Sequence, residues 1–175
     1  MAVTKEPETK GAMKPILLKG TGQALCLQLR IGSLGLELWD FPNEEAHGYA
    51  LLIFDRDREG MVDEQTDDER RKWTVTLPWY ACCAVSGAIQ DWLSFLESSI
   101  EEHHEPALHM ELASLTCDFY RKGVREGPKM VCNLQLECGL SRQSILTRSE
   151  ASLLGRLLFC QGDDDVDQYA SIKAQ

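Results

Sequence analysis

The hydrophobic pattern changes from a strand period to a helix period within residues 73–100. Trp73, Val75 and Leu77 alternate with polar residues, which is typical of a half-buried strand. Pro78 ends this alternation, and apolar residues then recur every three or four positions, which predicts a helix with one buried side. We expect this strand and helix to form the centre of the domain. The apolar positions of the predicted helix are Val85, Ile89, Trp92, Leu93, Leu96 and Ile100.

Period-two alternation also predicts strands before this central stretch. Residues 25–31 and 34–38 both alternate, and the Gly-Ser pair between them predicts a hairpin turn. Residues 49–54 are apolar at nearly every position, which favours a strand in the middle of a sheet. Residues 16–19 are a further candidate strand at the front of the chain.

The second half of the chain repeats this order. Strands are predicted at residues 108–112, 115–119 and 132–138, with residues 143–146 as a further candidate. The sequence Thr-Arg-Ser-Glu that follows, at residues 147–150, fits a capping box and predicts a helix start. Ala151, Leu154, Leu157 and Leu158 form the apolar stripe of this second helix, and Gly162 is predicted to end it.

The order strands, helix, strands, helix predicts an α+β fold. We expect one or more antiparallel twisted sheets of about seven to eight strands, with two helices covering one face or end. The order also suggests two similar halves, although no residue-by-residue repeat accompanies it. Residues 1–13 are predicted to be a disordered amino-terminal segment, residues 14–162 a single α+β domain, and residues 163–175 an acidic flexible tail.

The charge balance limits the classes of partner. The 175 residues include 28 Asp and Glu against 18 Lys and Arg, which gives a formal net charge of -10. A protein that binds phosphate backbones in general needs the opposite balance. The negative charge either serves solubility alone or attracts a basic protein partner. The amino terminus lacks a signal-peptide core and no apolar run is long enough to span a membrane, so we expect a cytoplasmic protein.

Cysteine and histidine are the residues with candidate chemistry. The chain has seven cysteines without CxxC spacing, and we expect buried thiols, with a zinc site and a redox or catalytic cysteine as alternatives. Cys82 and Cys83 stand at the start of the central helix, where a helix amino terminus lowers a thiol pKa. His103, His104 and His109 lack a ligand spacing such as HExxH, so we expect solvated side chains in place of a metal site.

No motif predicts an enzyme. The sequence lacks the glycine-rich phosphate-binding motifs and the GxSxG elbow of serine hydrolases, so no catalytic residue, cofactor or metal is predicted. A mixed-charge run follows the apolar strand at residues 49–54 and predicts a solvated loop, which could also recognise a partner. The candidate partner-binding residues are the acidic ones in this loop and in the tail, Asp63, Glu64, Asp67, Asp68, Glu69, Asp163, Asp164 and Asp165.

Two families share part of this pattern. AIQDWLSFLESS with the following LHMELASLTCDFY, and MVCNLQLEC followed by LTRSEASLLGRLL, resemble small bacterial immunity proteins of the WapI type over roughly residues 25–160. That resemblance implies a cytosolic protein that binds and blocks one toxin, and it assigns no functional residues. The order of strands and helices is also similar to Whirly-type single-stranded nucleic-acid binders, which need a basic, aromatic sheet face. Here that face would draw on Arg30, Lys72, Arg121 and Lys122 with Trp39, Tyr49, Trp73 and Tyr120.

The sequence therefore favours a non-enzymatic protein-binding module. Its sharper form is an immunity-type inhibitor of a basic toxin domain. The alternative is a Whirly-like single-stranded nucleic-acid-binding protein.

Overall fold

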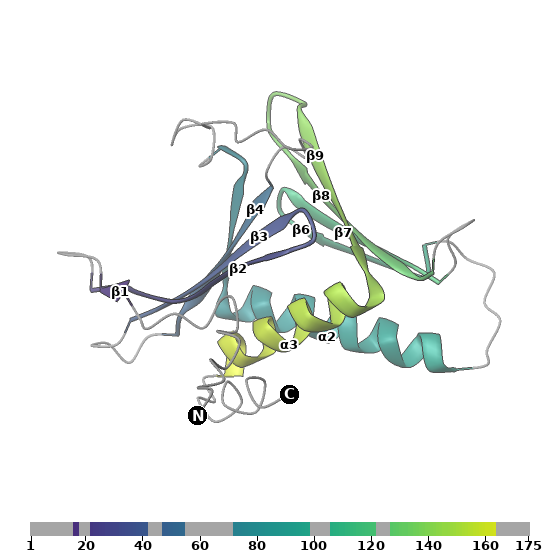
Figure 1. Cartoon of the computed structure of the whole chain (residues 1–175). Helices are drawn as coiled ribbons and strands as arrows, with labels where there is room; N and C mark the ends of the chain where they lie inside the picture. The colour runs from purple at the N-terminus through teal and green to yellow at the C-terminus, as the bar shows by residue number, and fades with distance from the viewer. Residues whose placement is uncertain are drawn as a thin grey trace, which may run out of the picture.

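The computed structural model describes residues 16–17, 22–41, 47–54, 72–98, 106–121 and 127–163. Their elements follow the predicted order of strands, helix, strands and helix (Figure 1). The first half contains β1 (Ile16–Leu17), β2 (Ala24–Ile31), β3 (Leu34–Asp40), β4 (Tyr49–Phe54), β5 (Thr74–Pro78) and α2 (Trp79–Glu97). The second half contains β6 (Leu108–Leu112), β7 (Leu115–Tyr120), β8 (Lys129–Gln135), β9 (Ser141–Thr147) and α3 (Arg148–Asp163).

The described strands form two separate antiparallel sheets. One has the order β1-β2-β3-β4-β5 and the other the order β6-β7-β8-β9, so each sheet is a meander of sequence neighbours. The α+β class and the antiparallel pairing are as predicted. The expected total of about seven to eight strands becomes nine within the described residues, because the two-residue β1 also pairs with β2. The helix α2 stands between β5 and β6 in the chain, and no pairing joins these two strands.

Both sheets lie on the same side of the helix pair, and α3 packs across α2 (Figure 1). Gly155 of α3 permits this close packing, because a Cβ atom there would meet the side chain of Ile89 at 3.0 Å. The buried hydroxyl of Ser86 in α2 donates to the backbone oxygen of Gly155 at 2.8 Å. The helices therefore touch through a glycine, a serine and a branched aliphatic side chain.

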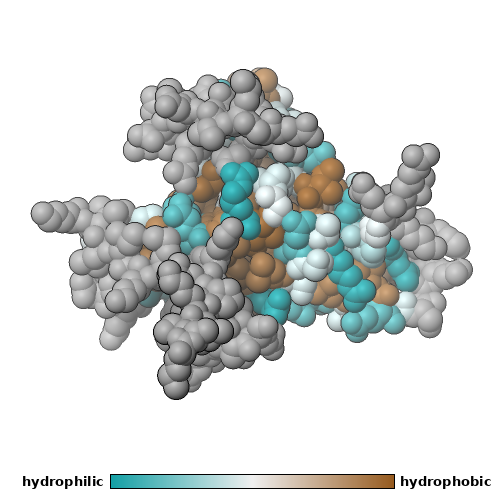
Figure 2. Space-filling view, in the orientation of Figure 1, coloured by the Kyte–Doolittle hydropathy of each residue, from teal (hydrophilic) through white to brown (hydrophobic). Residues whose placement is uncertain are grey.

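The hydrophobic core lies between the helices and the two sheets. The predicted stripe of α2 is confirmed at Val85, Ile89 and Trp92, which are fully buried, while Leu93 and Leu96 pack against the core from its margin. Ile100 lies outside the described residues. Figure 2 shows hydrophobic side chains gathered in the middle of this view, where β2 and α3 lie, with hydrophilic ones around them.

The capping box at the start of α3 is confirmed. The backbone N–H of Thr147 donates to the Glu150 carboxylate at 3.0 Å, and the N–H of Glu150 donates to the Thr147 hydroxyl at 3.3 Å. The predicted end is one residue too early, because α3 continues through Gly162 to Asp163. The helix α2 begins differently, since Pro78 precedes it and, within the described ranges, no side chain caps its first turn.

Arg142 of β9 links the two sheets. Its guanidinium donates to the backbone oxygen of Phe54 at 2.8 Å and lies 4.1 Å from the centre of the Trp73 ring. The hydroxyl groups of Ser33, in the turn that joins β2 to β3, and of Ser144 on β9 are 2.7 Å apart, which adds a second polar contact between the two sheets. Side chains therefore connect the sheets where no backbone pairing does.

In the part of the chain that the structure describes, neither helix has the length and apolar character needed to cross a membrane.

Candidate partner-binding site

Three aromatic side chains form an exposed cluster beside the start of α2. Trp79 and Tyr80 are the first two residues of this helix, and they are exposed to 42% and 62%. Their rings meet edge to face at 6.0 Å, and the ring of His47 stacks on Trp79 at 4.6 Å. We call His47, Trp79 and Tyr80 the aromatic patch. It is the candidate site for a partner, because large rings that are held in place outside the core suit binding better than flexible chains do.

A second set of aromatic rings supports the patch from the sheet. Trp39, Tyr49 and Pro78 lie in one row across β3, β4 and β5, so the strand that leads into Trp79 is paired with Tyr49. The Trp39 and Tyr49 rings stack 6.4 Å apart, and the ring of Phe41 lies 5.8 Å from that of Tyr49. The start of α2 is therefore fixed to a layer of packed rings.

Polar contacts hold this row in place. The Trp39 indole N–H donates to the buried carboxylate of Glu37 at 3.1 Å, and the Tyr49 hydroxyl donates to Gln23 at 2.7 Å. Burial, with a smaller contribution from the charge of Glu37, raises the pKa of Tyr49. The phenol therefore stays protonated and remains a donor.

Gln161, near the end of α3, forms hydrogen bonds with the end of β3 and the start of β4. The buried amide of Gln161 donates to the backbone oxygens of Trp39, at 2.5 Å, and Tyr49, at 3.1 Å. Gly48 lies between these groups, and a Cβ atom there would come closer than 3.0 Å to both the Gln161 amide and the Trp39 oxygen. A larger residue at position 48 would therefore move the strand ends that support the patch.

Part of this patch could be predicted from the helix period at the start of α2, although no functional motif marks it. The buried residues at the start of α2 are Ala81, Cys82 and Val85, which continue the stripe of the helix backwards. Tyr80 falls off that stripe, so a helix built on this period has to expose it, whereas Trp79 stands three residues before Cys82 and its exposure does not follow from the period. The contribution of His47, which lies more than thirty positions earlier, depends on the pairing of β4 with β5.

The acidic residues predicted to bind a partner lie mostly outside the described residues. These are Asp63, Glu64, Asp67, Asp68, Glu69, Asp164 and Asp165, whereas Asp163 is the last residue of α3. The described residues contain nine Asp and Glu and seven Lys and Arg, a formal charge of -2 out of the -10 of the chain. Most of the negative charge that would attract a basic partner therefore belongs to the other segments.

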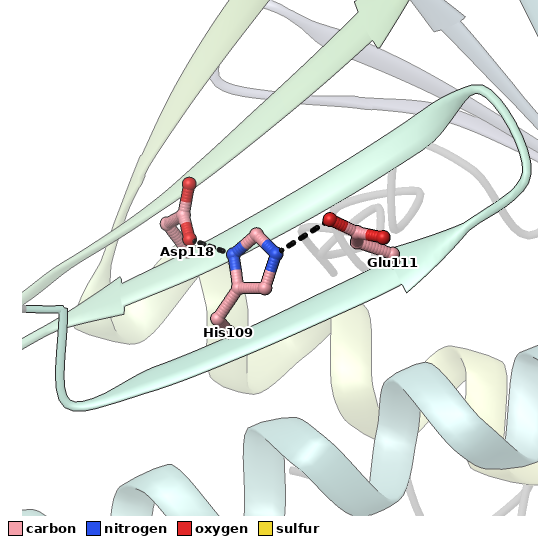
Figure 3. A network of polar contacts seen from close by, with 3 residues as sticks. All are labelled: His109, Glu111 and Asp118. Atoms are coloured by element: carbon pink, nitrogen blue, oxygen red, sulfur yellow. Dashed lines mark hydrogen bonds and ion pairs between the residues drawn. The ribbon is translucent and has the colours of Figure 1, made fainter.

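His109 bridges two carboxylates on the outer face of the second sheet (Figure 3). Its ring nitrogens contact Asp118 on β7 and, at 3.0 Å, Glu111 on β6. The hydrogen bond to Asp118, followed by the one to Glu111, raises the pKa of His109, which favours the charged ring. His109 projects from the polar side of its strand, as predicted. Within the described ranges, no group of three or more His, Cys, Asp or Glu is placed to hold a metal ion.

Cys82 is a buried thiol, as expected, and the alternative of a thiol activated by the helix start is wrong for this residue. Burial raises the pKa of this thiol to about 12, and the thiol donates to the backbone oxygen of Leu77 at 3.4 Å. Cys82 belongs to the buried stripe of α2, so loss of hydration outweighs the dipole of the helix start. His103 and His104 lie outside the described residues.

The side chains proposed for a nucleic-acid face are not gathered on one exposed surface. Trp73 is 6% exposed and Trp39 is 9% exposed, so neither ring offers a free face to a base. Lys72 lies 5.9 Å from the Trp73 ring and Arg121 lies 4.8 Å from the Phe95 ring, so both cations already sit on aromatic groups of the chain. Lys122 lies outside the described residues.

Comparison with models of protein families found no match for this chain, and comparisons with curated proteins and with solved structures found none either.

Proposed function

We propose that this chain is a non-enzymatic protein-binding module that anchors its partner on the aromatic patch. The observation that carries the proposal is the exposure of Trp79 and Tyr80 at the start of α2, on a support of packed rings. Tryptophan and tyrosine dominate the binding energy of many protein interfaces, because each buries a large area and loses few rotamers.

The support beneath the patch favours a preformed binding surface. The row from Trp39 to Pro78 and the amide of Gln161 hold the start of α2 before any partner arrives. A partner then orders fewer groups when it binds, so more of the interaction energy appears as affinity.

The sharper form of the proposal is an immunity-type inhibitor of a basic toxin domain. It is supported by the net charge of -10, most of which lies outside the described strands and helices. In this arrangement the acidic segments would speed the encounter with a basic partner, and the aromatic patch would slow its release.

The test begins with a tagged full-length chain used to capture partners from source cells, with and without nuclease. The captured protein is then purified, and its affinity is measured for the wild type and for Trp79→Ala and Tyr80→Ala. Each substitution is expected to raise Kd by about thirtyfold or more, which corresponds to a hot-spot residue. A partner that disappears with nuclease treatment would overturn the proposal and support the Whirly-like alternative.

Leu140→Ala is the matched control. Leu140 is exposed to 54% and lies between β8 and β9, so the variant removes a large exposed side chain away from the patch. Its Kd is expected to stay within about twofold of the wild type, since isolated surface substitutions have small effects. Equal losses in Leu140→Ala and Trp79→Ala would exclude the aromatic patch as the anchor.

Reversing the acidic charges should act on the association rate. We expect lysine at five acidic positions between β4 and β5 in the sequence to slow association with the same partner by about tenfold at low salt and to leave dissociation nearly unchanged. The salt dependence of association should become weaker, because fewer charges are screened. Stopped-flow or surface-based kinetics at two salt concentrations measure both effects, and an unchanged association rate would show that these positions do not take part in the encounter. The positions are Asp63, Glu64, Asp67, Asp68 and Glu69.

A further inference from the structure

Two buried cysteines face each other across neighbouring strands of the second sheet. Cys117 on β7 is directly opposite Cys132 on β8, and both side chains point into the core with at most 1% exposure. The two thiols are in hydrogen-bonding contact, which, together with burial, raises the pKa of Cys132 well above its ordinary value. This pair does not depend on the proposed function.

A backbone hydrogen bond at the carboxyl end of β8 shows whether Cys117 and Cys132 are a hydrogen-bonded or a non-hydrogen-bonded pair. The N–H of Gln135 donates to the oxygen of Ser114 at 3.0 Å, so the hydrogen-bonded positions of β7 and β8 alternate from there. Counting along the uninterrupted register makes Cys117 and Cys132 a non-hydrogen-bonded pair.

The turn between β8 and β9 gives the same result independently. The N–H of Leu136 donates to the oxygen of Leu140 at 2.8 Å. Hydrogen-bonded and non-hydrogen-bonded pairs alternate along β8 and β9 from this bond. The backbone N–H and C=O of Cys132 therefore point towards Ser144 on β9 and away from β7. Cα atoms in non-hydrogen-bonded pairs lie about 4.5 Å apart, which is inside the range of about 4.4–6.8 Å found for disulfides.

We propose that Cys117 and Cys132 are a redox-sensitive cross-strand pair that closes to a disulfide when an oxidant reaches it. With glutathione disulfide as the oxidant, one cysteine thiolate attacks a sulfur of glutathione disulfide and releases one glutathione thiolate. The second cysteine thiolate then attacks the mixed disulfide and releases the other. Two cysteine thiols are oxidised, one glutathione disulfide is reduced to two glutathione molecules, and the bond closes the loop of residues 117–132.

The rate of this reaction depends on how easily the oxidant reaches the two buried thiols. Both thiols lie in the same core as Phe119 and Leu134, so the oxidant reaches them when part of the sheet opens. The reduced pair is therefore expected to be stable in the folded protein, and the bond is expected to form faster under conditions that favour opening. Once formed, it should raise the folded-to-unfolded ratio by about a hundredfold, because it constrains the unfolded chain.

The test uses full-length protein with Cys138→Ser, which removes an exposed thiol that would react first. The protein is incubated with glutathione disulfide, without urea and with urea below the unfolding midpoint, then alkylated and digested without reduction. Mass spectrometry is expected to find a peptide that joins Cys117 to Cys132, and to find more of it with urea. The oxidised protein should unfold at a higher urea concentration than the reduced protein.

Cys117→Ala and Cys132→Ala serve as controls, and both should abolish the linked peptide. Alanine avoids placing a new hydroxyl in the core, and the mapping of the parent protein remains decisive if either control folds poorly. The inference is overturned if Cys117 and Cys132 stay reduced, and are therefore found alkylated, or if they join other thiols. This result counts under conditions in which glutathione modifies the Cys138 of the unsubstituted chain.

Discussion

Trp92→Ala is expected to lower the free energy of unfolding by about 3–5 kcal/mol, the largest loss among the substitutions considered for this chain. Trp92 is 0% exposed in the middle of α2, and its ring lies 5.4 Å from that of Phe119 on β7. Removing the indole would leave a cavity where the helix meets the second sheet. Urea unfolding followed by circular dichroism measures the loss as a lower midpoint.

Trp92→Phe separates packing from hydrogen bonding at the same position. Among the residues that the structure describes, the buried indole nitrogen of Trp92 finds no hydrogen-bond partner. Phenylalanine removes this donor, whose burial costs about 1–3 kcal/mol, and keeps a ring in contact with the core. The two effects oppose each other, so Trp92→Phe should change stability by less than about 1 kcal/mol.

Trp79→Ala is the matched control, because it removes the same side chain from the exposed start of the same helix. Its effect on unfolding should stay within about 1 kcal/mol. A loss in Trp79→Ala as large as that in Trp92→Ala would contradict the assignment of Trp92 to the centre of the core.

Gly48→Ala is expected to destabilise the protein by roughly 3 kcal/mol, at the upper end of the range for overpacking. The new Cβ atom would collide with the Gln161 amide and with the Trp39 backbone oxygen. The end of β3 or of α3 then has to move, which loosens the ring layer under the aromatic patch. Urea unfolding measures the stability, and the fluorescence of the tryptophans reports on the local change.

Two further variants serve as controls for the Gly48→Ala measurement. Gly87→Ala on α2 has open space around its new Cβ atom, so it should stabilise the protein by about 0.5–1 kcal/mol through helix propensity. In a Gln161→Ala background, most of the Gly48→Ala cost should remain, because the Trp39 oxygen belongs to the backbone and cannot turn aside. Complete relief in that background would identify the amide as the only obstacle.

The local elements were predictable because their signals lie within short segments. The alternation at Val75 and Leu77 corresponds to β5, which begins one residue after Trp73, and the stripe of Val85, Ile89 and Trp92 corresponds to α2. The box formed by Thr147 and Glu150 likewise needs only four consecutive residues. The α+β class and the exposure of Tyr80 follow from such periods, and the short connections between strands favour antiparallel pairing.

Contacts between distant segments were set by the tertiary structure. The split into two sheets depends on which edges pair, and Arg142 joins those sheets through Phe54 and Trp73 without a periodic signal. The raised pKa of Cys82 arises from burial, and it reverses what the position at a helix start alone suggests.

The candidate site also combines features that local sequence determines with contacts that only the tertiary structure determines. The sequence by itself determined that Tyr80 lies off the buried stripe of α2, because helix period is a local property. Only the tertiary structure brought His47 onto Trp79, placed Gln161 against the ends of β3 and β4, and set Cys117 opposite Cys132. Each of these contacts depends on strand register or helix docking, which the whole core decides together.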